Sequence, residues 1–241
     1  MTRLDRALVE RGLAPSRARA RALIAAGVVT VDGRAARRPA EAVGPEARIA
    51  LTDDPCPWVS RAGLKLAHAL DAFSLTPHGT ALDLGASTGG FTEVLLARGA
   101  AHVHAIEVGH GQLAPRLRGD PRITLHEGVN ARAIPQGLVP PVDWITADLS
   151  FIPLETALPP ALALARPGAT LVALIKPQFE AGPEHVGKGG IIGDPAVREA
   201  VCARIAAFLG PRGREVLGPV PSPIEGADGN REFLIAARRP S

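Results

Sequence analysis

Lysine is rare in this chain, and its few positions are the first candidates for chemistry. Of 27 basic residues among 241, only Lys65, Lys176 and Lys188 are lysines. Arginine stays protonated in proteins, whereas a buried lysine can lower its pKa and exchange a proton. A lysine kept in a chain that otherwise uses arginine therefore indicates a role that arginine cannot fill.

Two carboxylates accompany two of these lysines at the ends of predicted strands. Asp148 in "ADLSFI" ends one strand, Lys176 in "LIKPQFE" ends the next, and Glu232 in "GNREFLIAA" begins the last. Lys65 lies on a predicted helix in front of the first strand. Because ligands bind at the carboxyl edge of an open parallel sheet, we expect the four side chains to converge on one pocket. A buried ion-pair network that only stabilises the fold is the alternative.

A set of two lysines and two carboxylates suits the transfer of a methyl group to a sugar hydroxyl. The hydroxyl is a weak nucleophile, so its proton must leave as the methyl group arrives in line. If burial and a nearby cation lower its pKa, Lys176 can accept that proton or hold the nascent alkoxide. Methylation of carbon is not supported, because Cys56 lies in a predicted linker and Cys202 inside a helical pattern.

A glycine turn in "ALDLGASTGGFTEVLLARG", residues 81–99, joins a predicted strand to a predicted helix. It lacks the Gly-Lys-Ser/Thr of a phosphate loop and the full G-x-G-x-x-G of a dinucleotide fold. Asp83 precedes the first glycine, and Glu107 closes the next strand, where an adenosine ribose would offer its hydroxyls. Carboxylates tolerate a sulfonium and an ammonium, so the pattern favours S-adenosylmethionine over a nicotinamide. The alternatives are a turn-capping role for Asp83 and an ordinary strand-end acid at Glu107.

Strands and helices alternate from residue 61 onward, which predicts an α/β fold. Continuous apolar strands separated by amphipathic helices are typical of a parallel sheet covered on both faces. A Pro/Gly loop, "PSPIEGADGN", joins the last two strands and is too poor in helix formers for a crossover. The pattern therefore predicts a Rossmann-like sheet with an antiparallel C-terminal strand.

The N-terminal segment is smaller and strongly basic. It predicts two short helices, with Ser16 capping the second, and an Asp-Gly hairpin in "VVTVDGRAA". Up to Arg48, ten arginines and five acids give a charge of +5, against +3 for the whole chain. This distribution favours an arm that binds a polyanion, although a solvated helix face is the alternative. The arginines that we expect to contact RNA phosphates are Arg3, Arg6, Arg17, Arg19, Arg21 and Arg61.

The sequence predicts three segments: a small α+β domain at 1–51, a Pro-rich linker at 52–60 and the α/β domain at 61–241. No apolar run reaches the ~18 residues that a membrane helix needs. The first residues, "MTRLDRALVE", lack the apolar stretch of a signal peptide. The two cysteines lie far apart and form no metal-ligand pair, so we expect a cytoplasmic protein without disulfides or a metal site.

The chain resembles the TlyA family of rRNA ribose methyltransferases, historically labelled hemolysin A, over essentially its whole length. The N-terminus resembles the RNA-binding domain of ribosomal small-subunit protein four, and the body resembles the FtsJ-type methyltransferase fold. The motifs that carry the resemblance are "SRARARALIAAGVVTVDG", "WVSRAGLKL", "LDLGASTGGFTEVLL", "ADLSFI", "KPQFE", "VGKGGIIGDP" and "SPIEGADGNREF".

The resemblance implies roles for individual residues. A catalytic tetrad falls on Lys65, Asp148, Lys176 and Glu232. Contacts to S-adenosylmethionine fall on Asp83, Gly85, Ala86, Ser87, Thr88, Gly89, Gly90, Phe91, Glu107, Asn130 and Asp148, with Asn130 on the adenine side.

The family implies 2′-O-methylation of a cytidine in ribosomal RNA, with the rRNA or a ribosomal subunit as partner and no role for a membrane. Short members of the family, like this chain, are associated with the large-subunit site alone. Two other functions remain as alternatives: a non-catalytic ribosome-assembly factor, which would not need the strand-end lysines, and a membrane-active hemolysin, which would need a membrane segment or a cationic amphipathic helix.

Overall fold

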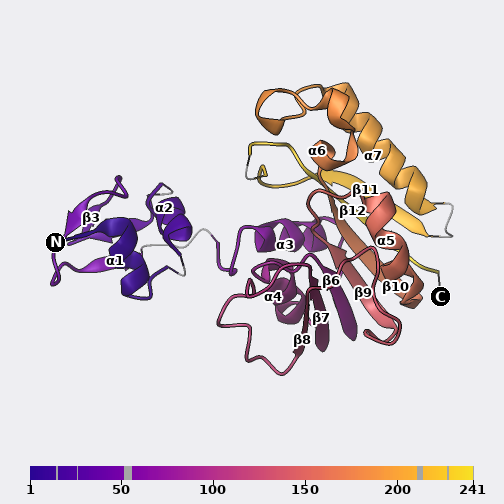
Figure 1. Cartoon of the computed structure of the whole chain (residues 1–241), viewed down its shortest axis with the longest axis horizontal. Helices are drawn as coiled ribbons and strands as arrows, with labels where there is room; N and C mark the ends of the chain where they lie inside the picture. Colours follow the sequence, from indigo (N-terminus) through magenta and orange to yellow (C-terminus); the bar gives the residue numbers. More distant parts are fainter. Residues whose placement is uncertain (15, 26, 52–55, 211–213, 227, 241) are drawn as a thin grey trace. The chain divides into compact units, whose positions relative to one another are not determined.

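The chain forms two compact units, Met1–Pro57 and Trp58–Ser241, in the computed structural model (Figure 1). The structure describes residues 1–14, 16–25, 27–51, 56–210, 214–226 and 228–240. The boundaries expected from the sequence remain a prediction, and residues 52–55 of the expected linker lie outside the described residues. Within the second unit, Trp58 packs so closely on Gly63 that a Cβ there would lie 2.4 Å from the indole ring.

The first unit is a small α+β structure, as the sequence predicts. Ser16 caps the second helix, since its Oγ accepts a hydrogen bond of 3.2 Å from the backbone N–H of Arg19. The hairpin turns at Asp32 and Gly33, both with positive φ, as Asp-Gly turns require. The elements are β1 (Thr2–Arg3), α1 (Leu4–Glu10), α2 (Arg17–Ala25), β2 (Val29–Val31), β3 (Arg34–Ala35), β4 (Ala42–Val43) and β5 (Ile49–Leu51).

This unit contains two small antiparallel sheets: β1 pairs with β4 in one, and the other has the order β3-β2-β5. Its own buried apolar cluster includes Leu4, Leu8, Leu23 and Val29. The helices and hairpin therefore share one core.

The second unit is a seven-stranded sheet in the order β11-β12-β10-β9-β6-β7-β8. Neighbouring strands run parallel except β12, which is antiparallel to both β10 and β11, as the sequence predicts. The strands are β6 (Thr80–Leu84), β7 (His102–Glu107), β8 (Ile123–Glu127), β9 (Val142–Ala147), β10 (Ala165–Ile175), β11 (Glu215–Pro221) and β12 (Phe233–Arg238). The helices are α3 (Ala62–Ala72), α4 (Gly90–Ala97), α5 (Leu154–Ala163), α6 (Pro177–Glu180) and α7 (Pro195–Leu209), with short 3-10 turns at Pro183–His185 and Lys188–Gly190.

Helices cover both faces of this sheet (Figure 1). Successive strand residues alternate between the two apolar clusters: Trp144 packs with helices α3 and α4, whereas the next residue, Ile145, packs with α5 and α7. A strand buried on both faces must be apolar at every position, which explains its continuous apolar sequence.

The strand order changes direction at β6. The chain passes from β6 to β7 and β8 on one side, then returns to β9 on the other side. The carboxyl ends of β6 and β9 therefore flank the switch point where ligands of open α/β sheets bind.

Candidate active site

A buried ion pair joins helix α3 to the last strand. Lys65 Nζ donates to Glu232 Oε2 at 2.5 Å, and the two side chains are only 9% and 3% exposed. Burying two charges is costly unless they are paired, so each residue depends on the other. Glu232 directly precedes β12, which confirms its predicted position at the start of this strand.

A second ion pair lies at the ends of the neighbouring strands. Lys176 Nζ is 2.7 Å from Asp148 Oδ1 and donates a hydrogen bond of 3.0 Å to Ser150 Oγ. Asp148 directly follows β9, and Lys176 directly follows β10. Glu180 ties the two segments together, because its Oε1 accepts the backbone N–H of Leu154 at 2.8 Å.

The strand register places the two ion pairs side by side. Ile175 pairs with Phe233 across β10 and β12, and Ala173 pairs with Ala147 across β10 and β9. Lys176, one residue beyond Ile175, therefore lies next to Glu232, one residue before Phe233. The four side chains thus come together at the carboxyl edge of β9 and β10. A cavity of about 460 Å³ lies between α7 and the end of β11; Glu232 is the one member of the four that lines it.

The glycine turn links β6 to α4 through backbone conformations that exclude side chains. Gly85 has a φ of +78°, and a Cβ there would lie 2.5 Å from the carbonyl oxygen of Asp148. Gly89, which has a φ of +94°, directly precedes α4. A Cβ on Gly89 would lie 2.4 Å from the side chain of Leu117. The turn residues 85–91, predicted to contact the cofactor, therefore lie beside Asp148 at the switch point.

The carboxylate of Glu107 is bound to the same turn. Its Oε2 accepts the backbone N–H of Ser87 at 2.9 Å, and its Oε1 accepts the backbone N–H of Gly109 at 2.8 Å. Gln112 Nε2 is 3.3 Å from the same Oε1. Glu107 is thus fixed at the end of β7 with lone pairs remaining for another donor. Asn130 follows the next strand, β8, with its Oδ1 accepting the backbone N–H of Arg132 at 3.0 Å.

Asp83 is completely buried below the turn. Its Oδ2 accepts from Thr92 Oγ1 at 2.6 Å and its Oδ1 from Thr146 Oγ1 at 2.8 Å. Burial raises the pKa of Asp83 to about 6; the two threonine hydrogen bonds oppose this increase and the charge of Asp148 adds to it. The side chain braces β6 against α4 and β9. The two threonines were missed by the sequence analysis, since only the fold brings them to Asp83.

Asp83 should make the stability of the second unit depend on pH. Its folded pKa of about 6 lies above the ordinary value of 3.8, so the folded state holds the proton more tightly than the unfolded state. Its contribution is fully present below about pH 4 and is lost as the pH rises through about 6, a change on the order of 2–3 kcal/mol. Urea unfolding at several pH values gives the free energy of unfolding of wild type and of Asp83→Asn. The variant should lack the part of the pH dependence that comes from Asp83. Parallel plots of the free energy of unfolding against pH for the two proteins would contradict the prediction.

Phe151 is an exposed aromatic residue that the sequence analysis did not select. It lies three residues after Asp148, is 89% exposed and has a φ of +64°, which strains a residue with a large side chain. Its ring lies 4.8 Å from that of Phe179, centroid to centroid. Backbone strain kept beside charged groups indicates a functional position. No sequence signal reveals it, because a positive φ is expected for glycine and not for phenylalanine.

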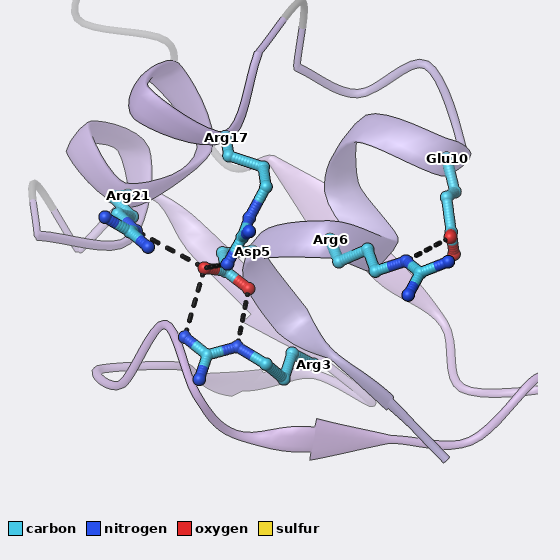
Figure 2. Close-up of polar contacts among 6 residues, drawn as sticks. All are labelled: Arg3, Asp5, Arg6, Glu10, Arg17 and Arg21. Carbon is cyan, nitrogen blue, oxygen red and sulfur yellow. Dashed lines mark hydrogen bonds and ion pairs between the residues drawn. The ribbon is translucent and has the colours of Figure 1, made fainter.

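The arginines predicted to bind RNA differ in their surroundings. Figure 2 shows Arg3, Arg17 and Arg21 around the carboxylate of Asp5, whereas Arg6 is paired with Glu10. Arg19 donates to the carbonyl oxygen of Cys56 at 3.2 Å. In the second unit, Arg61 is exposed and lies at the N-cap of α3.

Two further observations concern metals and membranes. Among the described residues, no three or more His, Cys, Asp or Glu side chains are grouped so that they could hold a metal ion. None of the helices formed by these residues is both long and apolar enough to cross a membrane.

Two protein families match the sequence. Residues 58–239 match the FtsJ-like methyltransferase family, and residues 2–49 match the S4 domain. The first match covers well over half of the chain, so the chain belongs to the FtsJ-like methyltransferase family.

Named relatives and a solved structure agree with this assignment. The chain is 47% identical to the 16S/23S rRNA (cytidine-2′-O)-methyltransferase TlyA of Mycobacterium tuberculosis, over 98% of this chain and 89% of that protein. It is 34% identical to the 23S rRNA (cytidine-2′-O)-methyltransferase TlyA of Campylobacter jejuni, over 73% of this chain and 69% of that protein. A putative hemolysin from Streptococcus thermophilus, of known structure, covers this whole chain with a TM-score of 0.75 and 36% identity, over 89% of its own length.

Proposed function

We propose that this protein transfers a methyl group from S-adenosylmethionine to the 2′-oxygen of a cytidine in ribosomal RNA, acting in the cytoplasm. The observation that carries the proposal is that two ion pairs, Lys65–Glu232 and Lys176–Asp148, lie at the carboxyl edge of the sheet. The names of the two TlyA relatives support a cytidine of rRNA as the substrate. The large-subunit RNA occurs in both names, and we propose it as the substrate here.

The residues at the glycine turn fit S-adenosylmethionine. Gly85 allows the turn to approach the carbonyl oxygen of Asp148 more closely than any side chain would permit. Glu107, anchored by backbone N–H groups, would hold the ribose hydroxyls with its carboxylate, and Asn130, beyond β8, would lie on the proposed adenine side. We propose residues 85–91, Asp83, Glu107, Asn130 and Asp148 as the cofactor site. The cofactor supplies an electrophilic methyl group on a sulfonium.

The ion pairs define what the protein contributes to the transfer. The ribose O–H bond breaks as the O–CH₃ bond forms and the S–CH₃ bond breaks, so one proton must be taken up. Asp148 and Ser150 fix Nζ of Lys176 in place. As an ammonium, Lys176 stabilises the developing alkoxide; once it has passed one of its own protons to Asp148 or to solvent, its free amine can accept the proton of the hydroxyl. Lys65 and Glu232 flank it as a rigid, buried pair, and most of the rate gain comes from holding the hydroxyl in line.

The experiment that tests this function uses rRNA from cells that lack the protein. Purified protein and S-adenosylmethionine carrying a labelled methyl group are incubated with large-subunit RNA, small-subunit RNA or the corresponding subunits. Primer extension at low dNTP then maps the new 2′-O-methyl group. Label at a cytidine of large-subunit RNA is expected. Absence of label from every RNA and subunit would leave an RNA-binding assembly factor as the better explanation, and lysis of liposomes would support a membrane-active function.

Phe151 should matter for substrate binding and not for stability. The exposed ring directly follows Ser150, which binds Lys176. It offers a flat apolar surface against which the base of the target nucleotide can stack, an interaction of about 1–3 kcal/mol per base. Phe151→Gly removes the ring and relieves the positive φ. We expect KM for RNA to rise about tenfold or more, while the urea midpoint stays the same or increases. An unchanged KM would contradict a substrate contact at this position.

A further inference from the structure

Three arginines surround one buried carboxylate in the first unit (Figure 2). Arg3 binds Asp5 through two hydrogen bonds, Nε to Oδ1 at 3.1 Å and one terminal nitrogen to Oδ2 at 3.2 Å. Arg17 and Arg21 donate to the same Oδ2 at 3.0 and 3.3 Å. Arg3 comes from β1, and the other two lie one helical turn apart on α2. The carboxylate thus gathers cations from two elements.

Stabilising Asp5 alone does not require three arginines. The hydrogen bond from Arg3, with smaller effects of Arg17 and Arg21, holds the pKa of Asp5 well below its usual range, so the carboxylate stays ionised. Three guanidinium groups against one carboxylate leave a local charge of +2. Their side chains remain 50%, 54% and 56% exposed. Each guanidinium has five N–H donors, of which Asp5 occupies two on Arg3 and one on each of the others. The remaining donors can bind a further anion.

A neighbouring arginine of the same unit provides a contrast. Arg6 on α1 pairs with Glu10 one turn further along, with Nε 2.7 Å from Oε1. Both side chains are exposed, and the pair has no net charge. Such surface pairs form and break readily in water. Arg6 is therefore neither fixed by a buried partner nor part of a net positive group.

We propose that Asp5 is a positioning residue: it holds Arg3, Arg17 and Arg21 as one preorganised face that binds backbone phosphates of the RNA strand. This inference rests on the proposed function, which supplies the RNA. Fixing a long side chain on binding costs about 0.5–1.5 kcal/mol, and a guanidinium already held by Asp5 avoids much of that cost. Phosphate contacts position a nucleic acid without reading its sequence.

Asp5→Asn in the full-length protein separates positioning from simple attraction. The substitution makes the protein more positive by one charge, so attraction alone predicts tighter binding of RNA. Positioning predicts the opposite: we expect the Kd for a large-subunit rRNA transcript, measured by filter binding at fixed salt, to increase about tenfold. The KM for RNA should rise in parallel while kcat stays unchanged. Equal or tighter binding by a variant that melts at the wild-type temperature would overturn the proposal.

Two lysine substitutions provide a test that does not disturb a buried residue. Arg21→Lys keeps the charge but loses the planar fork that binds Asp5 and a phosphate together. Arg34→Lys is the matched control, because Arg34 is an exposed arginine of β3 that is not among the arginines expected to contact RNA. We expect the first to weaken RNA binding about three- to tenfold, with little change in the slope of log Kd against log salt because the charge is kept. The control should behave like wild type. Equal effects of the two substitutions would contradict the proposal even if Asp5→Asn fails to fold.

The same measurements distinguish this inference from the proposed function. If the wild-type protein methylates rRNA and Asp5→Asn binds RNA equally well, only the role of Asp5 is wrong. If the wild-type protein binds rRNA but methylates none, the proposed function fails, whatever the variants show.

Discussion

Lys176→Ala should reduce the rate of methyl transfer by about 100- to 10,000-fold, the range typical for loss of a positioned acid or base. Lys176 Nζ is the group at the end of β10 that Asp148 and Ser150 hold in place. Alanine removes it without leaving a deeply buried cation. We expect kcat to fall while the affinity for S-adenosylmethionine, measured by calorimetry, remains close to that of wild type.

Two further variants sharpen this test. Lys176→Arg keeps a positive charge but does not release a proton near neutral pH, so we expect it to be almost as inactive as the alanine variant if proton transfer dominates. An active arginine variant would show instead that the charge, holding the alkoxide, is what matters. Lys188→Ala is the matched control, because Lys188 is the exposed lysine of a 3-10 turn and should retain full activity. Unchanged methyl transfer by Lys176→Ala would refute the role of this residue.

Glu232→Gln should destabilise the second unit and also abolish activity. The substitution leaves the ammonium of Lys65 buried without a counter-charge, and breaking a buried pair in this way costs about 3–5 kcal/mol. Urea unfolding, monitored by the fluorescence of Trp144 and Trp58, measures the loss as a lower midpoint.

The double variant Lys65→Met with Glu232→Gln separates the two effects. With both charges removed, most of the lost stability should return, because an apolar side chain can replace a buried ion at little net cost. Methyl transfer should remain absent. Recovery of activity along with stability would mean that the pair is structural only, the alternative left open by the sequence.

The positions of Asp148, Lys176 and Glu232 could be predicted because a strand buried on both faces is visible as an apolar run. A polar residue at the end of such a run falls at the sheet edge, and the alternation with helices predicts parallel strands whose carboxyl ends share one edge. The order of the strands comes from the structure. Lys65 was found through its rarity as a residue type. The fold confirms each of these placements, whereas the chemical roles of the four residues stay predictions.

Other features depend on distant parts of the chain and leave no local signal. Thr92 and Thr146 are ordinary residues of a helix and a strand until the fold brings them to Asp83. Asp5 was counted as one acid among the charges of a basic segment, although it organises three of the arginines. The six arginines expected to contact RNA have the same predicted role, because their partners can be identified only in three dimensions.

Strand β12 has a consequence for the order in which the site is completed as the chain folds. It lies between β10 and β11 in the sheet, although it follows both of them in the sequence. Glu232 directly precedes β12, so Lys65 has no counter-charge until this strand has inserted between its two neighbours. A folding intermediate without β12 can form the glycine turn and the basic unit, but it lacks one of the four charged groups. Insertion of this strand is therefore the step that completes the site.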